Sequence, residues 1–169
     1  MPIDTDVDTV RQIIAFILEI GISLRYGSVD DDTFLPGIDV REGALIVDES
    51  LLLYPGDLLH EAGHLAVTPA SFRPQLSGKV EAPHGNADEI EAAALCWSYA
   101  ACVHLRLDPR VVFHEHGYHG RSESLLLNFE LGVFPGLPEL VSAQMALTEA
   151  DAKRLGCAPF PAMQKWLRD

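Results

Sequence analysis

Residues 55–67 of the chain, PGDLLHEAGHLAV, carry its strongest structural pattern. Pro55-Gly56 suits the start of a helix and Pro69 blocks its continuation, so a helix is predicted from about Gly56 to Val67. Apolar residues wrap most of this helix, which predicts burial on nearly every side. A polar side chain within it then needs a partner, because an unpaired buried polar group costs roughly 1 to 3 kcal/mol.

Beyond Asp57 near the N-terminus of this helix, three polar side chains, His60, Glu61 and His64, interrupt that apolar surface. The two histidines stand one helical turn apart, so both rings leave the same face and can bind one tetrahedral zinc ion at about 2.0 to 2.1 Å. Glu61 lies beside them, where its carboxylate can take a proton from a water that zinc has acidified. The pattern predicts Zn²⁺ bound by His60 and His64, with Glu61 as general base. The alternative is a metal-free helix in which this spacing arose by chance.

A catalytic zinc site takes three protein ligands, and the candidates for the third stand at the head of the next predicted helix. Asn86 suits the N-cap of that helix, and Asp88 and Glu89 complement its dipole in the first turn. Glu91 lies further in and precedes the uncharged, alanine-rich run 92–103, which permits close packing on the helix of His60. Glu91 is therefore the predicted third ligand, with Asp88, one turn back on the same face, as the alternative.

A second group of histidines follows at His114, His116 and His119, together with Tyr118. Such a group can supply a hydrogen-bond donor to the oxyanion of a transition state, and His119 is the predicted catalytic residue, with Tyr118 as its alternative. If His116 or His119 ligates the metal instead, it displaces the carboxylate as third ligand. A polar loop that happens to hold histidines remains the plain interpretation.

The remaining pattern predicts an α+β, mainly helical fold in one domain over residues 1–169. Two strands, Gly37–Val40 and Ala44–Val47, flank Arg41-Glu42-Gly43 as a hairpin. A short strand is expected around Lys79–Ala82. Further helices are expected from Val7 to near Gly27, from Asn86 to before Asp108, over Ser122–Leu131, over Pro138–Leu155 with a break at Thr148, and over Phe160–Leu167.

The composition of the chain limits the classes of partner that it is expected to bind. The chain has 25 acidic against 12 basic residues and a formal net charge of −13, which disfavours nucleic acid and anionic membrane surfaces. Its three cysteines form no CxxC pair, which argues against a thiolate zinc site or a disulfide framework. The apolar run Ile13–Leu24 contains Glu19 and is too short to cross a bilayer, so we expect a cytoplasmic protein.

The HEAGH segment, with a hairpin before it and Asp88-Glu89-Ile90-Glu91-Ala92 after it, resembles the gluzincin metallopeptidases, specifically the ImmA/IrrE-like group. The resemblance covers residues 37–105. It implies a zincin-like fold, Glu91 as third zinc ligand, and a substrate-pairing edge strand at Ala44–Val47. The chain departs from the group at Ala93 and at Leu95-Cys96, where Asn and Phe-Ala are frequent, and no helix-turn-helix regulator domain is evident.

The expected function is therefore zinc-dependent hydrolysis of a peptide or protein substrate. A zinc-binding module that recognises a partner protein with little or no turnover is the alternative, because fold and ligands alone do not guarantee catalysis. The sequence leaves the substrate, the oligomeric state and any regulatory partner open.

Overall fold

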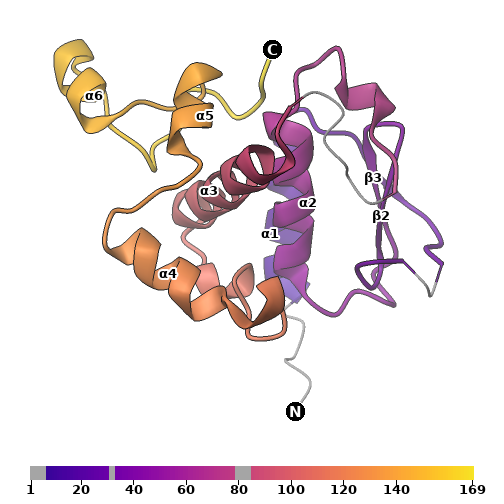
Figure 1. Cartoon of the computed structure of the whole chain (residues 1–169). Helices are drawn as coiled ribbons and strands as arrows, with labels where there is room; N and C mark the ends of the chain where they lie inside the picture. The colour runs from indigo at the N-terminus through magenta and orange to yellow at the C-terminus, as the bar shows by residue number, and fades with distance from the viewer. Residues whose placement is uncertain (1–6, 31–32, 79–84) are drawn as a thin grey trace.

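The computed structural model describes residues 7–30, 33–78 and 85–169 (Figure 1). Its α+β class, with helices as the larger part, agrees with the prediction. The predicted strand around Lys79–Ala82 lies outside the described residues. Within them the elements are α1 (Val7–Glu19), β1 (Leu24–Tyr26), β2 (Ile38–Arg41), β3 (Ala44–Val47), α2 (Pro55–Val67), η1 (Arg73–Gln75), α3 (Ala87–Leu105), η2 (Pro109–Val111), η3 (Tyr118–Gly120), α4 (Ser122–Glu130), α5 (Leu137–Ser142) and α6 (Glu149–Leu155).

The strands form one three-stranded sheet in the order β1-β3-β2. The predicted hairpin of β2 and β3 is confirmed, and both residues of its loop, Glu42 and Gly43, have the positive φ that tight hairpins require. The prediction that Ala44–Val47 is an edge strand is wrong. β3 pairs with β2 on one side and, in parallel, with β1 on the other, so its backbone is not free to pair with a substrate.

The first helix ends earlier than predicted. α1 stops at Glu19, and Gly21 adopts a φ of 93° while the amide of Ile22 donates to the carbonyl of Ile17 at 3.1 Å. This left-handed glycine is a common helix terminator, and it frees Leu24–Tyr26 to pair with β3 as a strand.

The sheet lies on one side of α2, and α3 to α6 lie on the other (Figure 1). α2 packs against α1 and, most extensively, against α3. Gly63 permits this close approach, because a Cβ atom there would lie 3.0 Å from the carbonyl oxygen of Ala94 and 3.2 Å from the ring of Trp97. Both predicted helices are confirmed, and the side chain of Asn86 caps α3 by accepting from the amide of Asp88 at 3.0 Å.

The C-terminal part agrees with prediction only in part, because α5 ends at Ser142 and residues 143–147 are not helical, whereas the predicted helix continued to a break at Thr148. α4 matches its predicted range, and Thr148 caps α6 after the predicted break. The helix predicted over Phe160–Leu167 is wrong: Gln164 donates its amide to the carbonyl of Met145 at 2.8 Å, and Arg168 donates its amide to that of Ala66 at 2.9 Å. These long-range partners take backbone groups that a helix would pair locally. Across the described ranges we find no helix with the length and apolar character of a membrane span.

Candidate metal centre

α2 brings His60 and His64 to the same side, as their spacing predicts. Their Nε2 atoms lie 3.1 Å apart, and the ring planes are inclined at 78°. Both side chains are largely buried, with 12% and 10% of their surfaces exposed. Two imidazoles in a mainly apolar interior thus face one point.

α3 supplies a carboxylate to that point. Oε2 of Glu91 lies 2.9 Å from Nε2 of His64, and Oε1 lies 3.5 Å from Nε2 of His60. In a tetrahedral zinc site with bonds of about 2.0 to 2.1 Å, ligand atoms stand about 3.3 Å apart. The three observed separations, 2.9, 3.1 and 3.5 Å, fall on either side of that value. The donor atoms therefore have the identity and mutual spacing that a tetrahedral cation needs.

Glu61 completes the cluster. One ligand atom from each of His60, Glu61 and His64 lies within 4.8 Å of the others, and this group could bind a metal ion. The Glu61 carboxylate makes no ion pair or hydrogen bond with either ring among the described residues, whereas that of Glu91 contacts both. By distance, Glu91 is therefore the carboxylate that contacts both rings, and Glu61 lies beside the three donor atoms.

Burial and mutual charge shift the pKa values of the cluster. Burial, followed by the charge of His64, lowers the pKa of His60 to about 3, so this ring keeps a lone pair free for a cation. Burial raises the pKa of Glu61 to about 7. Burial alone would lower the pKa of His64, but its hydrogen bond to Glu91 and the nearby carboxylates raise it. Burial would raise the pKa of Glu91, but the hydrogen bond to His64 and the neighbouring positive charges lower it.

Within the described part of the chain, the rings of His60 and His64 lack the hydrogen bonds that usually support metal-bound histidines. Metal-bound histidines almost always donate their second ring nitrogen to a polar partner, yet Nδ1 of His60 and Nδ1 of His64 are buried with no hydrogen-bond partner among the described residues. Against His60 lies the ring of Tyr118, edge-on, with centroids 5.4 Å apart and planes at 86°. Packing therefore holds His60 where a hydrogen bond usually would.

The other predicted candidates lie away from these donors. Asp88 is exposed at the start of α3, and His116 is exposed and pairs with Glu115 at 3.3 Å. His119 is exposed and makes no hydrogen bond, ion pair or ring contact with the cluster among the described residues. Tyr118, one position earlier, contacts His60 instead, so the geometry favours Tyr118 over His119 as the side chain next to the metal centre.

The sequence interpretation missed a buried pair next to the centre. Nε2 of His114 lies 3.1 Å from Oδ1 of Asp57, and both side chains are buried. The available signal was the position of Asp57, which lies one turn before Glu61 on a helix already predicted to be buried.

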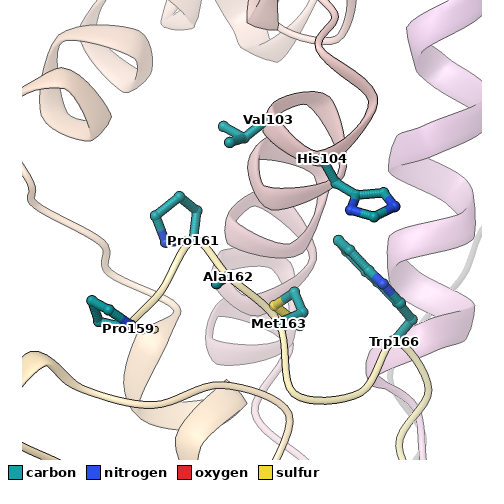
Figure 2. Close-up of a pocket in the computed structure, with 7 residues that line it drawn as sticks. All are labelled: Val103, His104, Pro159, Pro161, Ala162, Met163 and Trp166. Atoms are coloured by element: carbon teal, nitrogen blue, oxygen red, sulfur yellow. The ribbon is translucent and has the colours of Figure 1, made fainter. Parts of the chain in front are cut away.

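A separate groove of about 460 Å³ lies at the other end of α3 (Figure 2). His104 is thirteen positions from Glu91, about 20 Å along the helix axis. Of the described residues that line the groove, His104 alone is ionisable, and the others are Val103, Pro159, Pro161, Ala162, Met163 and Trp166. This groove is therefore mainly apolar and is no part of the metal centre.

Comparison with known proteins gives no relative: no family model, no curated protein and no solved structure matches the chain. The residues of the cluster therefore carry the functional argument.

Proposed function

We propose that this chain is a zinc-dependent metallopeptidase with a zincin-like fold, in which His60, His64 and Glu91 hold Zn²⁺ and Glu61 is the general base. The observation that carries the proposal is the convergence of two imidazole nitrogens and one carboxylate across the interface of α2 and α3. Two histidines and one glutamate are a ligand set of catalytic zinc sites, which leave a position for water or substrate.

A hydrogen-bond network is a weaker explanation of the same geometry. A proton on Nε2 of His64 can be shared well with only one of its two neighbours, Nε2 of His60 at 3.1 Å or the Glu91 carboxylate at 2.9 Å. A cation between the three atoms satisfies all of them at once. Because burial lowers the pKa of His60 to about 3, this imidazole is uncharged at neutral pH and keeps one ring nitrogen with a free lone pair.

A zinc ion bound there supplies a Lewis acid that polarises a peptide carbonyl and acidifies water. Glu61 provides the proton transfer. Its pKa of about 7 places it close to neutral pH, so the carboxylate can accept a proton from the attacking water and return it to the leaving amine. The Glu91 side chain is 43% exposed, so the cluster has an open side for a substrate.

The substrate strand expected along Ala44–Val47 is not part of this proposal, because β3 is the central strand. The outer edge of β2 is also engaged: the amide of Ile38 donates to the carbonyl of Leu35 at 3.2 Å, and the carbonyl of Val40 accepts from the amide of Gly78 at 2.7 Å. Peptide binding to the hairpin would have to displace these bonds.

The test compares wild type with Glu61→Gln, which keeps size and polarity but removes the base. We expect one zinc per chain in both proteins, and cleavage of members of a proteome-derived peptide library by wild type only. Equal cleavage by both would remove Glu61 from the mechanism. Zinc binding without cleavage by wild type would support the zinc-binding module that recognises a partner protein.

A further inference from the structure

Asp57 and His114 form a buried pair that the proposed reaction does not use. Besides the 3.1 Å contact to Asp57, the imidazole of His114 stacks on Tyr54, with ring centroids 3.9 Å apart and planes at 11°. Burying such a pair is costly, and its net contribution to stability is often small. The pair lies between α2, which carries the two histidines of the proposed metal centre, and the segment that leads to Tyr118, so we consider a structural role for it.

The pair joins the first turn of α2 to the segment that leads to Tyr118. The same two segments touch through their backbones at Gly56, where a Cβ atom would lie 2.0 Å from the carbonyl oxygen of Val111. Asp57 follows Gly56 and lies one turn before His60 and Glu61. The contact to His114 therefore fixes the next segment relative to the start of the metal-binding helix.

A tight turn connects His114 to Tyr118. The hydroxyl of Ser122 donates to the carbonyl of His114 at 2.6 Å, and the amide of Gly117 donates to the same carbonyl at 3.1 Å. Tyr118, His119 and Gly120 then follow with φ values of 55°, 54° and 76°. Consecutive left-handed residues with side chains are unfavourable, and such a turn persists only where its surroundings hold it in place.

Tyr118 is the end point of this chain of contacts. Its ring lies edge-on against His60 and 5.5 Å from the ring of Phe113, and its hydroxyl is buried. His64 and Glu91 contact the His60 ring at Nε2, and Nδ1 has no hydrogen-bond partner among the described residues, so the Tyr118 ring packed edge-on against His60 is a further restraint on the orientation of this imidazole.

We propose that Asp57 and His114 are positioning residues, which hold the turn over residues 117–120 so that Tyr118 fixes the orientation of His60 for metal binding. The inference rests on the proposed metal centre, but it requires no peptidase activity.

A double-mutant cycle on cobalt affinity tests it, with Co²⁺ measured by competition against a chromophoric chelator. Loss of outer-shell support typically weakens metal binding by about 10- to 100-fold. We expect about 10-fold weaker binding in each of His114→Phe, which keeps an aromatic ring on Tyr54, and Tyr118→Ala, and also about 10-fold in the double variant. Unchanged affinity in His114→Phe, or weakening that multiplies in the double variant, would overturn the proposal.

Two further variants separate positioning from general packing. His114→Gln keeps an N–H donor for Asp57, and we expect it to bind cobalt with an affinity near that of wild type. His116→Phe changes an exposed ring two positions away and is expected to have no effect. If His114→Gln binds cobalt as weakly as His114→Phe, the hydrogen bond between His114 and Asp57 does not position the turn, and the proposal fails.

Hydrogen exchange of the metal-free proteins gives a reading that does not depend on the metal centre. We expect faster exchange of the amides of residues 117–121 in His114→Phe, with α3 and the sheet unchanged. Unchanged exchange in the turn, or an equal increase throughout the chain, would reject the positioning role. If wild type binds no cobalt, the proposed function fails, and this exchange measurement still decides the inference about the turn.

Discussion

The carboxylate of Glu91 lies 2.9 Å from Nε2 of His64, across the interface between α3 and α2. This contact joins two segments that are far apart in the sequence and turns a pair of helical histidines into a set of three donors. If Glu91 is a metal ligand, Glu91→Ala should weaken zinc binding by more than the about 10- to 100-fold typical of an outer-shell partner. Asp88→Ala, one turn back and exposed, is the matched control and should leave the affinity unchanged. Titration against a competing chelator measures both, and retained affinity in Glu91→Ala would transfer the third ligand elsewhere.

A substitution at Gly63 tests the close packing of α2 on α3, which makes the contact between Glu91 and His64 possible. Alanine is intrinsically better than glycine in a helix by about 1 kcal/mol, so propensity alone predicts that Gly63→Ala stabilises the protein. The structure predicts the opposite sign, because the added Cβ atom would lie 3.0 to 3.2 Å from Ala94, Trp97 and Ser98 on α3. We expect a loss of about 1 to 3 kcal/mol in the free energy of unfolding, measured by chemical denaturation. A more stable Gly63→Ala protein would mean that α2 and α3 are less closely packed than described.

Glu61 should make the stability of the metal-free protein depend on pH. Its pKa is about 7 in the folded chain and 4.5 in the reference state, so the folded state binds more protons between these values. Its contribution is therefore fully present below about pH 4.5 and is lost as the pH rises through about 7. The difference in unfolding free energy between wild type and Glu61→Gln should fall over this window by roughly 3 kcal/mol. A flat difference would show that Glu61 is not buried in an unfavourable setting.

Arg73 should stabilise the C-terminal end of α2. Its guanidinium donates to the carbonyl oxygens of Leu65, Thr68 and Arg168 at 2.8, 3.0 and 2.7 Å. Hydrogen bonds from charged groups contribute about 1.5 to 3 kcal/mol each, and they are not additive, so we expect Arg73→Ala to lower the free energy of unfolding by about 2 to 4 kcal/mol. Arg73→Lys keeps the charge but not the planar donor fork, and it should recover only part of the loss. Thermal unfolding at one pH compares the three proteins.

The features that could be predicted from the sequence alone are those that depend on local pattern. The apolar surface and proline boundaries of α2 are local features, and the one-turn spacing of His60 and His64 determines their common face. Glu91 could be ranked above Asp88 because it lies deeper in an uncharged helix, and the structure brings Glu91 alone of the two to the histidines. These predictions needed only helical periodicity and the cost of burying charge.

Other features depend on contacts between distant segments, which periodicity does not reveal. The sequence predicted a first helix that continues to near Gly27, but α1 ends at Glu19 and Leu24–Tyr26 pairs with β3, which also turns β3 from an edge strand into a central one. Residues 160–167 have a helical pattern, yet Trp166 and Gln164 bond to Trp97 and Met145. Tyr118, and not His119, lies next to His60 because of a left-handed turn that neither residue type predicts.

The most direct test of the central claim is the zinc anomalous difference density of crystals of the purified protein. We expect one peak per chain, at about 2.0 to 2.2 Å from Nε2 of His60, Nε2 of His64 and a carboxylate oxygen of Glu91. Absence of a peak there, with the two imidazoles hydrogen-bonded only to each other and to Glu91, would contradict it.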